Sequence, residues 1–506
     1  MRSRYLRIHS ICYYTGSLLQ ILALVILTPL VVVAIYWGKD YGDGTQTILA
    51  FVLPAVLSWV AGALLRLWRA PTELDGTGSM LMCAVGWLCA SAFGALPFVI
   101  GIQASYLDGY FEAMSGFTTT GITVFQGLDE MPRSILFWRS LTQWLGGLGI
   151  ISFFLALIFR GKGSHKLLGA ESHKISARRP APGLLNTLKI LWGVYGLFTV
   201  GSITLLALEG MPVFDAVNHT LTALSTGGFS PYDNSIGQYA FEDHANHRLI
   251  EYTLTFIMLL GGINFLVHYR VLTCDVKALW DSLEIRWWWG LLAAFVGIIL
   301  LDHLSATGFL HQPQQDGQVA WHALEEGFRH TIFQVVSILT TTGFGTRDIG
   351  SFPVVSRQLF LVMMVIGGCV GSTGGGCKVM RIAVLTRLMR REVFRIRVPR
   401  RASSKLVIDG QLIPPNEINR VAVIFFSWIL LLVLGGGITA ALSGQGPWQS
   451  FSGMFSALGN IGPCYISVPD MVQIHWGVKL TYIVGMLAGR LEILPVLLLL
   501  APKAWR

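Results

Sequence analysis

The chain has 506 residues, of which 53% are hydrophobic and 13% are charged. Soluble domains carry about 25% charged residues, so this composition excludes a soluble enzyme with a single anchor and indicates a polytopic membrane protein. A formal net charge of +9 is also typical of nucleic-acid-binding proteins, but the location of the basic residues, described below, argues against that class.

Hydropathy divides the chain into ten predicted spans and four shorter apolar segments. A transmembrane helix needs about 20 apolar residues, and a half-span is too short to cross a membrane. The first two spans, 17–37 and 46–68, precede four repeats of the order span, half-span, loop and span. The paired spans are 79–101 and 135–159, 188–208 and 250–269, 287–304 and 358–389, and 421–442 and 475–500; the half-spans are 106–117, 213–224, 321–338 and 447–458.

These segments predict an all-α polytopic membrane protein. Its four repeats of span, pore half-helix, filter loop and span (M1-P-M2) are expected in a pseudo-fourfold arrangement, preceded by two extra transmembrane helices. The corresponding units are residues 1–75 for the two N-terminal helices, 76–175, 176–282, 283–400 and 401–506 for the four repeats. Two basic connectors, 160–189 and 390–420, follow the first and third repeats.

A short loop recurs after each half-span, and recurrence at a near-constant interval is the first signal to weigh in a sequence. The four copies are Thr118-Thr119-Thr120-Gly121, Ser225-Thr226-Gly227-Gly228, Thr340-Thr341-Thr342-Gly343 and the degenerate Gly459-Asn460-Ile461-Gly462. Their last glycines are 107, 115 and 119 residues apart. One Thr-Gly pair is typical of a turn or a close-packing position, but four equivalent copies favour a shared function.

Such loops suit a dehydrated monovalent cation. Non-helical backbone at membrane depth is tolerated only where it is buried or lines a water-filled path, and glycine reaches backbone angles that aim neighbouring carbonyl groups inward. Four loops around one axis predict a ring of carbonyl oxygens that replaces the hydration shell of potassium. The C-terminus of each half-helix would point its negative dipole end at the ion.

The charges predict the topology. With both termini placed inside, 28 of the 37 Lys and Arg residues fall on the inner side, which fits the positive-inside rule. The positions of the basic residues are therefore explained by membrane topology, and they do not indicate a nucleic-acid-binding surface. Nine acidic residues flank the half-spans on the outer side and as a set predict a cation-attracting vestibule, although each alone is typical of a solvated loop: Asp108, Glu112, Asp215, Asp233, Asp302, Glu325, Glu326, Asp348 and Asp470.

The last span of the third repeat carries six glycines in ten residues: Gly367, Gly368, Gly371, Gly374, Gly375 and Gly376, with Ser372 and Thr373 between them and Lys378 just after. Each glycine costs a helix about 1 kcal/mol against alanine, so an unwound segment is expected. Apolar sequence on both sides places it at membrane depth, below the loops, where a gate would lie. The alternative is a small-residue surface for helix packing.

Arg490 lies within the last predicted span. An intramembrane arginine is costly and faces a cavity or a partner. Glu492 is two residues away and so points to another face of the helix. Two interpretations stay open: a fixed positive charge below the filter that limits how cations leave, or a structural ion pair across helices.

The TTTGI, STGGF, TTTGF and GNIGP loops, the GSTGGGCK break and the GRLEILP segment together resemble the TrkH/KtrB/HKT superfamily of potassium transporters. The resemblance covers nearly the whole chain, and the two extra N-terminal spans resemble the TrkH branch. It implies a potassium-uptake pore in a bacterial inner (cytoplasmic) membrane, a homodimer of four-repeat pores, and a peripheral TrkA-like partner. The RCK domains of that cytoplasmic subunit would bind a nucleotide (ATP/ADP or NAD) and gate the pore.

The resemblance also implies that the segment from Gly367 to Gly376 and Arg490 form the barrier under the filter. The fourth loop departs from the Thr-Gly pattern, which leaves the degree of selectivity open. Two transport mechanisms remain: a gated, channel-like pore and an ion-coupled symporter that moves potassium with protons or sodium. A membrane-bound enzyme would need a clustered acid/base or metal constellation, and the sequence contains none; we expect no catalytic residue and no cofactor beyond the transported potassium.

Overall fold

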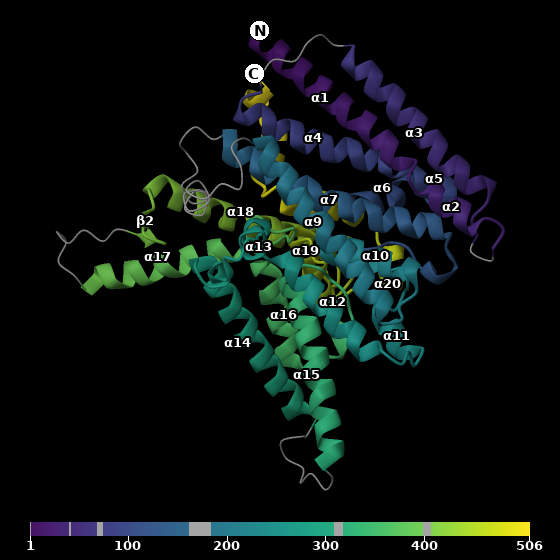
Figure 1. Ribbon diagram of the computed structural model, residues 1–506. Coiled ribbons are helices and arrows are strands. Elements are labelled where there is room, and N and C mark those ends of the chain that lie inside the picture. The colour runs from purple at the N-terminus through teal and green to yellow at the C-terminus, as the bar shows by residue number, and fades with distance from the viewer. Residues whose placement is uncertain are drawn as a thin grey trace.

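The computed structural model describes residues 2–39, 42–67, 74–160, 184–307, 317–397 and 406–505, which are mostly helical (Figure 1). The predicted unit boundaries at 175 and 400 lie outside the described residues, as do residues 161–183 of the first basic connector and 398–405 of the second.

Three helices precede the repeats: α1 (Arg2–Ile26), α2 (Leu30–Tyr36) and α3 (Thr45–Arg66). Helices α1 and α3 lie side by side in Figure 1 and touch through two glycines, because a Cβ on Gly16 would lie 2.6 Å from the carbonyl oxygen of Gly62. Small residues allow such close backbone approach between membrane helices. Arg7 Nη1 donates to the carbonyl oxygen of Ala504 at 2.7 Å, so the two ends of the chain share one face.

The repeats follow in chain order with the expected elements. The first repeat contains α4 (Gly76–Gly94), α5 (Leu96–Gly101), α6 (Tyr106–Phe117) and α7 (Arg133–Arg160). The second repeat contains α9 (Leu184–Leu208), α10 (Val213–Leu224), α11 (Gly237–Phe241), α12 (His247–Gly262) and α13 (Phe265–Leu272), and the third contains α14 (Leu283–Ala306), α15 (Gly317–Leu339), α16 (Val354–Ile366) and α17 (Val379–Arg397). The fourth repeat contains α18 (Pro415–Ser443), α19 (Pro447–Gly459), α20 (Val468–Gln473), α21 (Trp476–Arg490) and α22 (Leu494–Leu499). The half-helices α6, α10, α15 and α19 match the predicted half-spans closely, and α15 begins earlier than expected.

Within the described ranges, six helices are long and apolar enough to cross a membrane: Arg7–Tyr36, Thr45–Arg66 and the first span of each repeat, Gly76–Gly101, Leu185–Leu208, Leu283–Ala306 and Pro415–Ser443. Their outer surfaces expose many Leu, Val and Ile side chains, as a lipid-facing surface does. The fold is therefore that of a multi-pass membrane protein.

The second spans of repeats two to four are broken, which corrects the prediction of continuous spans at 250–269 and 475–500. Helices α12 and α13 are bent by 106° at Gly262–Phe265. Helix α21 ends at Arg490, and α22 begins at Leu494 after two positive-φ residues, Glu492 and Ile493. The predicted break in 358–389 is present between α16 and α17, and α17 leaves the helix bundle sideways (Figure 1).

The repeats close into a circle. Each half-helix packs against the second-span helix of the preceding repeat: α10 against α7, α15 against α12, α19 against α16, and α6 against α21. This order returns from the fourth repeat to the first, so the four half-helices surround one axis with their C-termini inside. The pseudo-fourfold arrangement of half-helices is thus a property of the packing as well as of the sequence.

A small hairpin of β1 (Val407–Ile408) and β2 (Gln411–Leu412) interrupts the second basic connector. Its turn is Asp409-Gly410, with φ of 47° and 80°, a residue pair that favours tight hairpins. The Asp409 carboxylate accepts from the Leu283 backbone N–H at 3.1 Å, and Ile408 is buried. The hairpin therefore ties the connector to the start of α14.

Candidate functional site

The four predicted loops share one backbone conformation. The second residue of each has φ between 50° and 61°, and the last glycine has φ between 77° and 106°. The second residues are Thr119, Thr226, Thr341 and Asn460; the glycines are Gly121, Gly228, Gly343 and Gly462. A positive φ is strained for a residue with a side chain, so its recurrence at one position of all four loops indicates a conformation that the surroundings impose.

The same backbone hydrogen bonds tie each loop to its own half-helix. The N–H of the third loop residue donates to the carbonyl five residues earlier: Thr120 to Ser115, Gly227 to Thr222 and Thr342 to Ser337 at 2.8 Å, and Ile461 to Ser456 at 3.1 Å. The second residue donates three residues back in every copy. The fourth loop, with its degenerate sequence, is therefore geometrically equivalent to the others.

The loops interlock in a ring. A Cβ on Gly121 would overlap the carbonyl oxygen of Gly227, one on Gly228 would overlap that of Thr342, and one on Gly343 would overlap that of Ile461. A Cβ on Gly462 would lie 3.1 Å from the carbonyl oxygen of Thr120, which closes the circle. Each glycine of one repeat thus lies against the carbonyl that precedes the glycine of the next, and only a residue without a side chain fits these positions.

The ring combines buried walls with accessible glycines. Ser225, Thr226 and the threonines of loops one and three are buried, whereas Gly121, Gly228 and Gly343 are partly exposed. Hydroxyl pairs brace two opposite loops, Thr118 with Thr120 and Thr340 with Thr342, each at 2.7 Å. Carbonyl oxygens and the C-terminal ends of four half-helices both favour a positive ion at this place.

Gln143, a residue that the sequence analysis missed, clamps the second loop from α7. Its Nε2 donates to the carbonyl oxygen of Gly227 at 2.7 Å, and its Oε1 accepts from the Phe229 N–H at 3.0 Å. Because a backbone N–H can only donate, this pair fixes the orientation of the amide. The only sequence signal was one amide side chain within a largely apolar predicted span.

A buried ion pair supports the first loop. Arg139 Nη2 lies 2.7 Å from Glu112 Oε1, and both side chains are almost completely buried. The Glu112 carboxylate also accepts from the Val124 N–H at 3.1 Å, and Arg139 donates to the Ser230 carbonyl at 3.0 Å. One pair therefore fixes the segments that follow loops one and two.

Each of the nine outer carboxylates contacts a basic side chain or accepts a hydrogen bond, and the acidic vestibule stays a prediction. Five form ion pairs: Asp108 with Lys479, Glu112 with Arg139, Asp215 with Arg133, Glu325 with Arg329, and Glu326 with Arg347. The other four accept hydrogen bonds from nearby groups: Asp233 from Gly127, Asp302 from Ser356, Asp348 from Gly350, and Asp470 from Ser467. A basic neighbour thus offsets the charge of five carboxylates, while the four that accept from neutral donors keep their negative charge.

The glycine-rich segment lies directly against the inner side of the loops. Thr373 donates through its hydroxyl to the Leu224 carbonyl at 3.0 Å, and the Gly375 N–H donates to the Thr341 hydroxyl at 2.6 Å. A Cβ on Gly374 would lie 2.9 Å from the Thr340 carbonyl oxygen. The segment therefore touches the second and third loops. Its backbone lies so close to the third loop that a side chain at Gly374 would not fit.

The same segment wedges into the bend of the second repeat. The Cys369 N–H donates to the Gly262 carbonyl at 3.0 Å, and the Thr373 N–H donates to the Gly261 carbonyl at 3.2 Å. These carbonyls are free because α12 ends there. The backbone of the segment reverses direction repeatedly, because φ lies between 74° and 77° at Gly367, Gly371, Gly376 and Lys378. Gly368 and Ser372 lie between these positions, and the Ser372 hydroxyl donates to the Cys369 carbonyl at 2.6 Å.

Arg490 joins three repeats through backbone carbonyls. Its Nη1 donates to Thr373 at 2.6 Å and its Nη2 to Gly146 of α7 at 3.0 Å, and the side chain is 2% exposed. No carboxylate of the described residues pairs with it. Glu492 instead pairs with Arg381 of α17 at 2.5 Å. The ion-pair interpretation of Arg490 is therefore wrong. The other interpretation stays a prediction: Arg490 is a fixed positive charge, which backbone carbonyl groups hold in place.

Lys378 adds a second cation at the end of the segment, where its Nζ donates to the carbonyl oxygen of Gly374. All the predicted gate residues thus lie in one cluster between the loops and α17. The described residues contain no group of His, Cys, Asp or Glu that could hold a metal ion.

A multi-span helical fold with four interlocked re-entrant loops defines a class of membrane proteins that transport cations. The family model for TrkH, a cation transport protein, matches residues 57–506. The chain belongs to this family.

Similar proteins extend over the whole chain. The Trk system potassium uptake protein TrkH of Vibrio parahaemolyticus is 32% identical over 99% of this chain and 100% of its own length, and that of Salmonella typhimurium is 32% identical over 97% and 98%. An uncharacterized cation transporter of Methanocaldococcus jannaschii is 31% identical over 98% of this chain and 95% of its own. The crystal structure of the potassium transporter TrkH from Vibrio parahaemolyticus superposes with a TM-score of 0.85, at 30% identity, over 98% of this chain and 99% of that chain.

Proposed function

We propose that this chain is a potassium uptake protein of a bacterial inner membrane, and that potassium passes through the ring of four loops. The observation that carries the proposal is the closed contact of each loop glycine with the carbonyl oxygen of the next repeat. Carbonyl oxygens held at fixed positions replace the water of a dehydrated potassium ion. The relatives named as potassium uptake proteins support the choice of ion.

The segment from Gly367 to Lys378 and Arg490 form the gate below this ring. Arg490 holds the segment to α7 and places a positive charge on the path of the ion. A gate needs two arrangements whose balance a partner shifts. A segment without regular helix changes shape without breaking one, and α17 leads from Lys378 directly to the protein surface.

A peripheral nucleotide-binding subunit of the TrkA type acts on this gate through α17. This helix exposes apolar side chains, Phe394 and Ile396 among them, beside a series of arginines. Such a face suits a protein partner better than bulk water. The partner would bind on the cytoplasmic side, where the shared face of the two termini also lies, and two copies of the pore would pair as a homodimer.

Flux into liposomes tests the proposal. The purified chain should take up rubidium or potassium down a concentration gradient without sodium or a proton gradient, and addition of the nucleotide-loaded partner should change the rate. Uptake that requires sodium or a proton gradient would instead establish the symporter. Absence of potassium flux from properly folded, inserted protein would refute the assignment of the ring as the ion path.

A further inference from the structure

The junctions between repeats follow a charge rule. At three of them a basic residue at the start of the second-span helix meets an acidic residue of the next half-helix. Arg133 lies 3.5 Å from Asp215, Arg248 lies 3.7 Å from Glu325, and Lys479 lies 2.5 Å from Asp108. The pairs join successive repeats near the outer ends of the helices.

The junction of α16 with α19 breaks this rule. Arg357 is the fourth residue of α16, as Lys479 is of α21, but the third residue of α19 is Gln449, where α6 and α10 have Asp108 and Asp215. Helix α19 contains no acidic residue. Within the described part of the chain, Arg357 has no carboxylate within 4 Å, and its buried Nε has no hydrogen-bond partner. A guanidinium that is partly withdrawn from water and unpaired is unfavourable.

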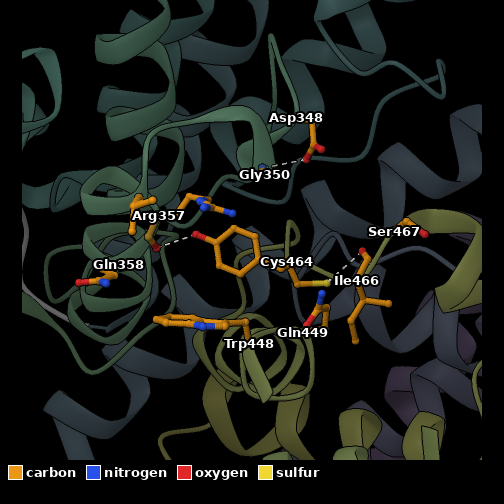
Figure 2. A pocket seen from close by; sticks show the side chains of 11 residues that line it. Asp348, Gly350, Arg357, Gln358, Trp448, Gln449, Cys464, Ile466 and Ser467 are labelled. Atoms are coloured by element: carbon orange, nitrogen blue, oxygen red, sulfur yellow. Dashed lines mark hydrogen bonds between the residues drawn. The ribbon is translucent and has the colours of Figure 1, made fainter. Parts of the chain in front are cut away.

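A cavity of about 370 Å³ occupies this junction. Figure 2 shows the side chains of Arg357, Gln358, Trp448 and Gln449 that line it, together with that of Asp348. The Tyr465 hydroxyl donates to the Arg357 carbonyl at 2.6 Å and fixes one wall. Helices α16 and α19 both begin at the cavity without an acidic residue in the first turn and without a side-chain cap. Two helix N-termini and one guanidinium therefore favour an anion in this cavity.

We propose that this cavity binds the headgroup of a zwitterionic phospholipid, whose phosphate replaces the acidic side chain present at the other junctions. Arginine binds phosphate oxygens through two N–H groups at once. The Asp348 carboxylate, which repels a free phosphate, suits the ammonium group of the same headgroup. The surroundings are apolar, since Trp448 and Val354 are 53% and 60% exposed, and tryptophan is typical of the membrane–water interface.

The test compares lipid retention by the full chain purified in detergent, measured by native mass spectrometry. The variants are Arg357→Gln, which removes the cation, and Gln449→Asp, which restores the acid found at the other junctions. Arg347→Gln is the matched control, because Arg347 pairs with Glu326 and does not line the cavity. Melting temperature is measured in parallel with short-chain phosphatidylethanolamine, short-chain phosphatidylglycerol or inorganic phosphate as the added probe.

We expect both cavity variants to retain about tenfold less phosphatidylethanolamine than the wild type, as loss of a charge-assisted contact implies. Gln449→Asp should also melt higher than the wild type in lipid-free detergent, because it supplies the missing charge internally. Wild-type retention in both variants would overturn the proposal. Stabilisation by inorganic phosphate as strong as that by phosphatidylethanolamine would show a free-anion site, and equal stabilisation by phosphatidylglycerol would remove the role of Asp348.

Discussion

Replacement of Gln143 by leucine tests whether the second loop depends on its clamp. Leucine is similar in size but makes neither the hydrogen bond to the Gly227 carbonyl nor that to the Phe229 N–H. Each of these two buried groups would lose its partner at a cost of about 1–3 kcal/mol. A loss of about 2 kcal/mol changes an equilibrium between an ordered and a distorted loop roughly 30-fold.

The assay is rubidium uptake into liposomes in competition with sodium, from which a permeability ratio follows. We expect Gln143→Leu to lower potassium-over-sodium preference about tenfold or more, because a displaced Gly227 carbonyl leaves the ring incomplete on one side. Trp144→Phe is the control: it removes the adjacent hydrogen bond to Thr199, at 3.1 Å, away from the loops. An unchanged ratio in Gln143→Leu, with a melting temperature that falls as in the control, would refute the reasoning.

Three further predictions concern the ring and the gate. Gly228→Ser should lower the potassium/sodium permeability ratio, since a Cβ there overlaps the Thr342 carbonyl; a wild-type ratio would exclude Gly228 from the filter. Arg490→Ala should raise rubidium flux without the partner about tenfold or more, because two hydrogen bonds from a charged group are lost; flux that falls in a folded variant would contradict this. Deletion of several glycines from 371–376 should leave flux high and independent of the partner and its nucleotide, and a folded, closed, nucleotide-responsive variant would remove this segment from the mechanism.

The half-helices and loops could be predicted because their signals are local. The end of α6 at Phe117 and of α10 at Leu224 coincide with the change from apolar residues to Thr, Ser and Gly. The loop pattern also repeats four times, so each copy supports the others. Even the fourth copy, with Asn460 in the place of threonine, keeps the glycine that the backbone requires.

The bend between α12 and α13 could not be predicted in the same way, because the contacts that hold it come from elsewhere in the chain. The bend at Gly262 is held by N–H groups of Cys369 and Thr373, more than a hundred residues later. The sequence between 250 and 269 is mostly apolar on both sides of the bend, so hydropathy predicts one span. Gln143 was missed for the same reason: it acts on a loop 84 residues away.

The interlocked loops also bear on how the proposed ion path can change during evolution. All four belong to one polypeptide, so a single codon alters one quarter of the ring, whereas in a pore of four identical subunits every substitution is made four times. Ion preference can therefore shift in small steps. Neighbouring loops touch through glycine and carbonyl, and opposite loops do not share such a contact. Substitutions in the second and third loops should then constrain each other, while the first and third are free to diverge separately.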